Sequence, residues 1–496
     1  MPYYIFNEDY YLKNDVKRII LYSHSELKNN SSKDWGSFIH PLHAKLLNIF
    51  NQPIRIEEAV NKALGIIPNI GKSKLKEIIN SFTANNMPFY VEWNGCQIKF
   101  PKNLIIRSNN NSINRKEIDL SYFNGIKQID LTTKRLYSSP LDIIYMLTNK
   151  CFVNCAYCYA DRNTKSNDIN FEVFLDFVRQ AKALNVRYID LIGGDILRKK
   201  NWDMYLKFLI NNGFSPRFIS TKKVVTEDDI NKLINCNYKN EIQFSLDTLN
   251  SINSKKLLAV NSNYISDVVT SLTLLDKSGL KLRINTVISS LNIDKSDLIS
   301  ICNLLNKLEN IVEWEIRLFM PSLYLSRKTN SILKVNDKNV KILKEFIQNE
   351  LALYCKHKIL YFDNTQFNPT TNLSCNKELE WRCSANISSF FILPDGKVTI
   401  CEQLYWNDKF IIGDISKETI EEIWNSEKAI LLSDIYSKIQ CQKGACVKCK
   451  DNKNCFTKAK RCWVNVLKYN GKDNWLDPDP LCNKYFNNKY SKIETL

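Results

Sequence analysis

The sequence predicts an α/β protein organised around a parallel β-sheet, and three observations support this fold class and a division into several domains. Between residues 141 and 320, apolar runs of strand length alternate six times with amphipathic helical segments. Strands that alternate with helices form parallel sheets with right-handed crossover connections. A segment of mixed strand and helix character precedes the repeats at residues 1–106, and a cysteine-rich segment follows them at residues 371–496. A chain of 496 residues exceeds one ordinary core, so several domains are expected.

The composition of the chain limits its function classes. No apolar run approaches the length that spans a bilayer, and the N-terminal stretch has acidic residues where a signal peptide has basic ones. Sixteen cysteines without an export signal favour a reducing cytoplasm and metal-bound thiols. The net charge is +17, but the Lys and Arg residues are dispersed, which disfavours a nucleic-acid partner and leaves an acidic peptide as the better fit. We therefore predict a cytoplasmic protein that does not bind membranes.

Residues 1–106 predict a small α+β domain. Strands are expected at residues 3–6 and 18–23, and helices at residues 41–50, 54–64 and 73–85. A hairpin should close this domain, because Asn94-Gly95 separates two alternating apolar strands. Residues 107–140 begin with a polar, Asn-rich stretch and are predicted to form a linker.

The repeats at residues 141–320 predict a sheet of six parallel strands, an arrangement that can also close into a barrel of the kind considered below. The six strands are expected at residues 141–147, 187–192, 217–220, 241–246, 281–288 and 312–319. A bridging helical segment should follow at residues 321–370. Chemistry in such barrels gathers at the C-terminal ends of the strands, so the candidate site residues are those that directly follow a strand.

The loop after the first expected strand carries Cys151, Cys155 and Cys158 in a C-x3-C-x2-C pattern. Three thiolates in one loop can hold three irons of a [4Fe–4S] cluster and leave the fourth iron open. An electron-transfer cluster would normally have a fourth cysteine. Zinc is the alternative ligand, but three cysteines without a nearby histidine or fourth cysteine make a poor closed zinc site.

This loop, and the strand before it, resemble the radical S-adenosylmethionine (SAM) superfamily, whose partial (β/α)6 barrel suits six repeats. The resemblance implies that Cys151, Cys155 and Cys158 bind the catalytic cluster and that its open iron chelates SAM. It also implies contacts with the adenine, the amino group and the ribose of SAM. The residues that would make these contacts are Tyr157, Gly193, Gly194, Asp195, Ser245 and Asp247. Asp195 stands where the family has a longer glutamate, and a plain strand-end turn is the alternative reading of Asp247.

The later cysteines resemble the SPASM domain, a C-terminal extension of radical SAM enzymes that act on peptides and proteins. The resemblance implies two auxiliary [4Fe–4S] clusters, and hence three in total. One would take Cys375, Cys383, Cys401 and Cys462, and the other Cys446, Cys449, Cys455 and Cys482. Six residues separate Cys455 from Cys462 where the family usually has three, and Cys441 is a spare that could replace Cys375 or Cys462. Zinc fingers are the alternative, because C-x2-C is a common zinc half-site.

The two resemblances together imply a peptide-modifying enzyme. The N-terminal pattern is similar to the winged-helix-like domains that bind the leader of a precursor peptide in such enzymes. The expected reaction uses a 5′-deoxyadenosyl radical to install a thioether or carbon–carbon crosslink in a ribosomally synthesised peptide, with a flavodoxin or ferredoxin-like electron donor. The alternatives are a sulfatase-type maturase that oxidises Cys or Ser to formylglycine, and a non-catalytic peptide-binding protein on a decayed barrel. The sequence identifies no general base.

Overall fold

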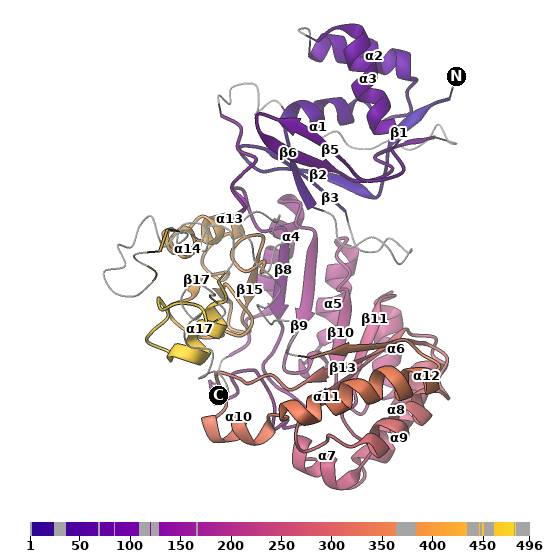
Figure 1. Cartoon of the computed structure of the whole chain (residues 1–496), viewed down its shortest axis with the longest axis vertical. Helices are drawn as coiled ribbons and strands as arrows, with labels where there is room; N and C mark the ends of the chain where they lie inside the picture. The colour runs from indigo at the N-terminus through magenta and orange to yellow at the C-terminus, as the bar shows by residue number, and fades with distance from the viewer. Residues whose placement is uncertain are drawn as a thin grey trace. The chain divides into compact units, whose positions relative to one another are not determined.

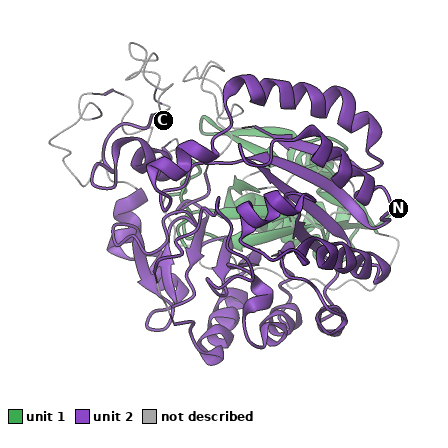
Figure 2. Ribbon diagram, turned by 90° about the horizontal axis from the view of Figure 1, so that it is seen from below, with its two compact units in different colours: residues 1–139 green, residues 140–496 purple. Residues whose placement is uncertain are grey.

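The computed structural model divides the chain into two compact units, residues 1–139 and residues 140–496, which are described separately (Figure 2). The structure describes residues 2–23, 36–67, 70–83, 85–108, 120, 128–164, 167–363, 383–433, 446, 449–450, 461–480 and 482. Three candidate cysteines, Cys375, Cys441 and Cys455, lie outside the described residues.

The first unit contains the strands, helices and hairpin that the sequence predicts, together with three further strands. Its strands are β1 (Tyr4–Phe6), β2 (Tyr10–Asn14), β3 (Ile19–Ser23), β4 (Gly36–Ile39), β5 (Phe89–Trp93), β6 (Cys96–Phe100) and β7 (Ile105–Arg107). Its helices are α1 (Pro41–Asn48), α2 (Ile56–Ile66) and α3 (Lys72–Thr83). Strands β2, β3 and β4 form an antiparallel sheet, β1 pairs with β7, and β5 pairs with β6. The β5–β6 hairpin turns at Asn94 and Gly95, which both have positive φ, as an Asn-Gly turn requires.

Part of the predicted linker is built into the first unit. The Asp15 carboxylate accepts hydrogen bonds from the backbone N–H groups of Tyr137 and Ser138, at 2.7 and 2.9 Å. Arg18 pairs with Asp15 at 2.8 Å, and both side chains are fully buried. Burying a charge is tolerated only when it is paired and hydrogen-bonded, so this cluster fixes the chain around residue 137 to the unit. The first unit therefore extends to residue 139 rather than ending near residue 106.

The second unit contains the six predicted parallel strands and one more. They are β8 (Asp142–Met146), β9 (Tyr188–Ile192), β10 (Phe218–Thr221), β11 (Glu241–Ser245), β12 (Leu282–Ile288) and β13 (Ile311–Leu318), followed by β14 (Ile359–Phe362) (Figure 1). Strands β10 to β14 form one parallel sheet, and β8 pairs in parallel with β9. Strand β9 lies against β10, so the strands follow one another in chain order.

Helices connect the strands of this barrel. They are α4 (Phe171–Ala183), α5 (Trp202–Asn211), α6 (Glu227–Asn235), α7 (Ser251–Leu258), α8 (Tyr264–Lys277), α9 (Lys295–Leu305), α10 (Arg327–Leu333), α11 (Asp337–Phe346) and α12 (Ala352–Tyr354), with a short 3-10 turn, η2 (Ile196–Arg198), after β9. Along β12, the fully buried residues Leu282, Ile284, Thr286 and Ile288 alternate with the half-buried residues Arg283, Asn285 and Val287. A sheet covered by apolar side chains on both faces would show no such alternation. One face of the sheet is therefore polar, as suits the inside of an open barrel that admits a polar ligand.

The cysteine-rich segment continues the sheet of the barrel. Strand β15 (Ser389–Ile392) pairs in parallel with β8, and β16 (Lys397–Thr399) and β17 (Ile411–Asp414) extend the sheet beyond it. The turn between β15 and β16 ends at Gly396, whose φ is +87°. Helices α13 (Ile420–Trp424), α14 (Glu427–Ser433) and α17 (Trp463–Asn470) complete the described part of this segment. The pairing of β15 with β8 places the cysteine-rich segment beside the strand that leads into the first cysteine loop.

Candidate active site and auxiliary cluster sites

The first cysteine loop lies at the C-terminal end of β8 and is anchored by its backbone. The N–H groups of Asn154 and Ala156 donate to the carbonyls of Leu258 and Leu257 at the end of α7, at 2.9 and 2.7 Å. These bonds fix the shape of the loop, which places Cys151 within electrostatic range of the Cys155 and Cys158 thiols. Three thiols carried by one short loop are the donor type that an iron–sulfur cluster requires, so the residue types fit this cofactor.

Gly193 and Gly194 lie against this loop. A Cβ atom on Gly194 would lie 2.5 Å from the Lys150 carbonyl oxygen and 2.7 Å from the Cys151 sulfur, and one on Gly193 would lie 2.9 Å from the Thr148 carbonyl oxygen. Real Cβ atoms do not approach other atoms so closely. Glycine is therefore required at both positions because the end of β9 lies directly against the cysteine loop. The sequence alone does not indicate this contact.

Asp195 is buried, and its carboxylate is hydrogen-bonded within the protein. It accepts from the Thr221 hydroxyl at 2.8 Å, from the Lys222 N–H at 2.9 Å and from the Leu197 N–H at 3.1 Å. Burial raises the pKa of Asp195, while these hydrogen bonds oppose the rise. The carboxylate thus ties the end of β9 to the end of β10, and it lies next to the cysteine loop because the Asp195 N–H donates to the Lys150 carbonyl at 2.8 Å.

Asp247 and Tyr157 meet at a lysine that the sequence analysis did not select. The Lys222 ammonium lies 2.6 Å from the Asp247 carboxylate, whose side chain is fully buried, and the Tyr157 hydroxyl donates to the same carboxylate oxygen. Burial opposes the charge on Lys222, but the carboxylate outweighs it, and the pKa of Lys222 is raised. The positive charge of Lys222 in turn offsets part of the rise that burial causes in the pKa of Cys155, which reaches about 11.

Ser245 is the remaining candidate for a SAM contact. It ends β11 and pairs in register with Asn285 of β12. Ser245 is half-buried, on the same side of its strand as the polar residues Gln243 and Glu241. Alternate residues of a strand share one face, so Ser245 lies on the polar face of the barrel sheet.

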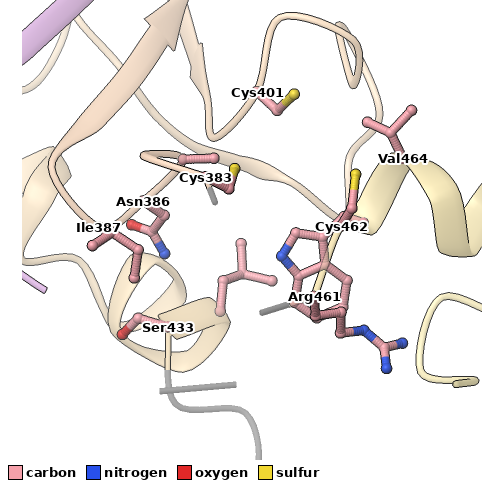
Figure 3. Close-up of a pocket in the computed structure, with 11 residues that line it drawn as sticks. Cys383, Asn386, Ile387, Cys401, Ser433, Arg461, Cys462 and Val464 are labelled. Atoms are coloured by element: carbon pink, nitrogen blue, oxygen red, sulfur yellow. The ribbon is translucent and has the colours of Figure 1, made fainter. Parts of the chain in front are cut away.

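Cys383, Cys401 and Cys462 surround a cavity of about 40 Å³ in the cysteine-rich segment (Figure 3). They come from three separate segments: a loop before β15, the end of β16 and the start of α17. The Gln403 N–H points at the Cys401 sulfur at 3.5 Å, and the N–H groups of Val464 and Asn465 point at that of Cys462. Backbone N–H donors stabilise thiolates, so these cysteines also suit an iron–sulfur cluster.

Cys446, Cys449 and Cys482 come together at a second place. Burial raises the pKa of Cys446, and the charges of Cys482 and Cys449 add to this rise, while Arg461 opposes it. Arg461 also lines the cavity of Cys383, Cys401 and Cys462, so this residue lies beside both groups of cysteines, although its guanidinium points away from that cavity (Figure 3). The Asp479 carboxylate accepts from the Cys462 N–H at 2.7 Å, and its carbonyl accepts from the Cys482 N–H at 2.9 Å.

Two tyrosines link the first cysteine loop with the cysteine-rich segment. Tyr159, which follows Cys158, is hydrogen-bonded to Tyr405, which lies four residues after Cys401. Tyr405 is 1% exposed and adopts a positive φ of 34°. A bulky residue with positive φ is uncommon and strained, so surrounding contacts must hold it. No sequence signal marks this contact, because the two residues are about 250 positions apart.

Within the part of the chain that the structure describes, no set of three His, Cys, Asp or Glu side chains has the close spacing of a single-ion site, the candidate cysteines included. Of the remaining cysteines, Cys236 and Cys302 are buried core residues. No described helix is long and apolar enough to cross a membrane.

Comparison with known protein families identifies two domains in the chain. Residues 145–304 match the Radical SAM superfamily, and residues 383–456 match SPASM, an iron–sulfur cluster-binding domain. The chain therefore contains a radical SAM domain followed by a SPASM domain, which confirms these two predicted domains and the α/β fold class. These domains imply SAM and [4Fe–4S] clusters as cofactors.

Solved structures show the same fold over nearly the whole chain. The crystal structure of Streptococcus suis SuiB bound to its precursor peptide SuiA has a TM-score of 0.63 and 16% sequence identity, and the match covers 97% of this chain and 99% of that chain. SuiB bound to S-adenosylmethionine gives a TM-score of 0.60, with 96% and 99% covered.

Curated relatives match a shorter region. A GTP 3′,8-cyclase of Campylobacter curvus is 28% identical over 148 residues, which are 28% of this chain and 44% of that protein. A probable GTP 3′,8-cyclase of Methanocaldococcus jannaschii is 25% identical over 172 residues, 34% of this chain and 57% of that protein. The chain spans about half the length of these relatives.

Proposed function

We propose that this protein is a radical SAM maturase that modifies a ribosomally synthesised precursor peptide by installing a thioether or carbon–carbon crosslink. One observation carries the proposal. The C-x3-C-x2-C loop at the end of β8 lies in the same unit as the two groups of SPASM cysteines, and β15 joins the two parts in one sheet. The likeness in fold to a protein crystallised with a precursor peptide supports a peptide as the substrate.

In this proposal Cys151, Cys155 and Cys158 hold the catalytic cluster. When bound, this cluster and SAM supply a 5′-deoxyadenosyl radical that abstracts hydrogen from an unactivated C–H bond. The chain contributes orientation and exclusion of water, because a reactive radical must meet only the intended carbon. Gly193 and Gly194 set the distance between the strand end and the loop, and Asp195 holds that strand end in place.

Lys222 has two roles in the proposed SAM site. It neutralises Asp247 beside the cysteine loop, and its position after β10 suits contact with the carboxylate or ribose of SAM. Tyr157 and Ser245 complete the proposed SAM contacts. Because the Asp195 carboxylate is already satisfied within the protein, we propose that its neighbouring backbone, rather than a free carboxylate, faces the SAM amino group.

We propose that the SPASM cysteines hold two auxiliary clusters, so that the chain carries three. Cys383, Cys401 and Cys462 with Cys375 would hold one, and Cys446, Cys449 and Cys482 with Cys455 the other. Arg461 lies between them and would compensate part of the negative charge that eight thiolates bring.

The first unit is proposed to bind the leader of the precursor. Three helices followed by the β5–β6 hairpin give it a winged-helix-like order of elements. Addition of the leader as a strand to a sheet edge would use main-chain hydrogen bonds, which tolerate a varied sequence in the rest of the peptide.

The test is direct. The anaerobically reconstituted protein is incubated with SAM, a reductant and each short peptide that an open reading frame beside its gene encodes. Formation of 5′-deoxyadenosine with loss of two hydrogen atoms from the peptide, located by tandem mass spectrometry, is the expected result. Cyclisation of GTP in a parallel incubation, with no change in the peptide, would overturn the proposal in favour of the activity of the curated relatives.

A further inference from the structure

Two cysteines outside the candidate cluster sites contact each other. Cys302 lies in α9 and is 0% exposed, whereas Cys355 directly follows α12 and is half-buried. The Cys302 thiol donates a hydrogen bond to the Cys355 sulfur, and neither thiol is part of a disulfide. The fold therefore brings together two thiols that are far apart in the sequence, one closed off from solvent and one accessible to it.

Hydrogen bonds on both sides of Cys355 hold it against α9. The Asn306 side chain, at the C-terminal end of α9, donates to the Tyr354 carbonyl at 3.2 Å and accepts from the Lys356 N–H at 2.7 Å. The Tyr354 hydroxyl donates to the Asn303 side chain of α9 at 2.7 Å. Because three bonds join the same two segments, the contact between the thiols is set by the framework around it and not by the thiols alone.

An unusual helical turn orients Cys355. A π-helical turn, η3 (Ile347–Leu351), lies between α11 and α12 and packs against α9. Its hydrogen bonds span one residue more than those of an α-helix, so the residues after it are rotated about the helix axis. The Cys355 N–H donates to the Leu351 carbonyl at 3.0 Å, while the neighbouring Leu353 is 84% exposed. The rotated end of the helix thus turns Cys355 towards α9, and π turns are frequent at functional sites.

We propose that Cys302 and Cys355 form a reversible thiol–disulfide site whose oxidant is a small disulfide such as oxidised glutathione. The Cys355 thiolate attacks one sulfur of the oxidant, which gives a mixed disulfide and releases one molecule of glutathione. The Cys302 sulfur then attacks the Cys355 sulfur, the bond between the two cysteines forms, and the second glutathione leaves. The two cysteines lose two electrons and two protons in total, and one oxidised glutathione becomes two reduced molecules. This site goes beyond the proposed function, because it needs neither a cluster, nor SAM, nor a peptide.

The surroundings of the two sulfurs set this order of attack. Burial raises the pKa of Cys302 to about 12, and the hydrogen bond to Cys355 adds to the rise, so Cys302 stays a thiol. The thiolate is the form that attacks a disulfide, so the accessible Cys355 reacts first. Cys302 completes the reaction because it is already in contact with Cys355, and its proton passes to the leaving glutathione sulfur.

The disulfide would tie the last strand of the barrel sheet to α9. Strand β14 begins shortly after Cys355 and stands at the edge of its sheet, where it pairs with β13. A crosslink stabilises the folded state mainly by restricting the unfolded chain between its two cysteines. Cys355 precedes the N-terminal end of β14, whereas the candidate active site follows the C-terminal end of β8. Oxidation should therefore stabilise the second unit without changing the chemistry at the other end of the strands.

The experiment uses the full reconstituted protein and the variant Cys355→Ser. Both are incubated without oxygen in oxidised or in reduced glutathione and then unfolded in an alkylating reagent, and their digests are analysed by mass spectrometry. The melting temperature and the iron content are measured for each state. The matched control is Cys236→Ser, which changes another buried cysteine of the same unit and keeps a donor for the hydrogen bond to the Asp203 carbonyl.

We expect oxidised glutathione to give a crosslinked peptide pair that contains Cys302 and Cys355, lighter by two hydrogen atoms than the separate peptides. The pair should form in the parent protein and in Cys236→Ser, be absent from Cys355→Ser, and disappear in reduced glutathione. Oxidation should raise the melting temperature by on the order of 5 °C in the first two proteins and leave that of Cys355→Ser unchanged. Equal iron content in both states shows that the candidate cluster cysteines did not react.

Three outcomes would overturn the inference. A mixed disulfide that persists at Cys355 without the crosslink would show that the two sulfurs cannot join. An equal rise in the melting temperature of Cys355→Ser would assign the stabilisation to other groups. A crosslinked protein with an unchanged melting temperature would show that the disulfide does not secure β14. Because no measurement uses SAM or a precursor, these outcomes do not depend on whether the peptide proposal holds.

Discussion

Lys222 shows how single residues near the cysteine loop depend on one another. Its side chain is 13% exposed, and its ammonium faces the carboxylate of Asp247, whose side chain is fully buried. The Val287 N–H and the Tyr157 hydroxyl also donate to this carboxylate. A buried carboxylate with all its partners is stable, but removal of one partner leaves an uncompensated charge whose desolvation is costly.

Lys222→Met should therefore destabilise the second unit by about 3–5 kcal/mol, the usual cost of breaking a buried pair from one side. The double variant Lys222→Met/Asp247→Asn should recover most of this loss, because it also removes the unpaired carboxylate. Thermal melting of the apoprotein measures both effects. The control is Lys232→Met on α6, whose pair with Asp228 is exposed and screened by solvent, so the melting temperature should stay nearly unchanged. If the melting temperature of the double variant is as low as that of the single variant, the unpaired Asp247 carboxylate is not the cause of the destabilisation.

At the scale of elements, the strands could be predicted from the sequence because their signal is local. All six apolar runs form strands, and no strand end differs from the expected position by more than one residue. The pairing of β15 with β8 could not be predicted, since it joins segments about 250 residues apart and depends on the whole sheet. The contact between Tyr159 and Tyr405 could not be predicted for the same reason. The pair of Lys222 with Asp247 could not be predicted either, because it forms only when two strand ends meet in the folded sheet. A lysine after a strand looks ordinary until its buried partner is known.

The glycine pair after β9 provides a test at this scale. Gly194→Ala would place a methyl group 2.5 Å from the Lys150 carbonyl and 2.7 Å from the Cys151 sulfur, so the cysteine loop must move. We expect loss of the catalytic cluster, with about four fewer iron atoms per chain, and loss of SAM cleavage. The control is Gly65→Ala in α2, where a Cβ meets nothing within 4 Å. Full iron content in Gly194→Ala would show that the loop tolerates displacement.

The helix α1 and the β5–β6 hairpin provide a test with pH. His40 and His43 pack against Trp93, at ring distances of 4.3 and 6.1 Å, and burial lowers the pKa of each to about 4. Because the folded state keeps these rings neutral, their stabilisation is complete above an unfolded pKa of about 6.5 and is lost as the pH falls from there towards 4. For His43 the full loss is on the order of 3 kcal/mol.

Melting of the first unit between pH 7.5 and 5 checks this expectation. The melting temperature should fall with the pH, and His43→Phe should flatten the dependence, since a phenyl ring fits beside Phe82 and Phe100 without titrating. An equal slope in the variant would assign the pH dependence to other groups.

At the scale of the whole molecule, the division into two units decides how leader binding can be separated from SAM chemistry. The Asp15–Arg18 cluster and its bonds to Tyr137 and Ser138 place the chain up to residue 139 in the first unit. The sequence alone suggests a truncation in the predicted linker, near residue 111. That truncation would leave Tyr137 and Ser138 attached to the second unit without their buried partner Asp15. A truncation before Pro140 follows the division that the structure shows.

We therefore expect the chain that begins at Pro140 to keep its clusters and to cleave SAM slowly with a reductant. It should fail to modify the full precursor, because the leader no longer has its proposed site, whereas the isolated first unit (residues 1–139) should bind the leader alone. The control is Asp15→Ala in the full chain, which removes the acceptor of the Tyr137 and Ser138 bonds and leaves Arg18 buried without its carboxylate. This variant should lower the stability of the first unit by about 3–5 kcal/mol and weaken leader binding without changing basal SAM cleavage. If the chain that begins at Pro140 modifies the precursor at the full rate, the first unit has no part in substrate choice, and the peptide must be recognised by the barrel and the SPASM domain alone.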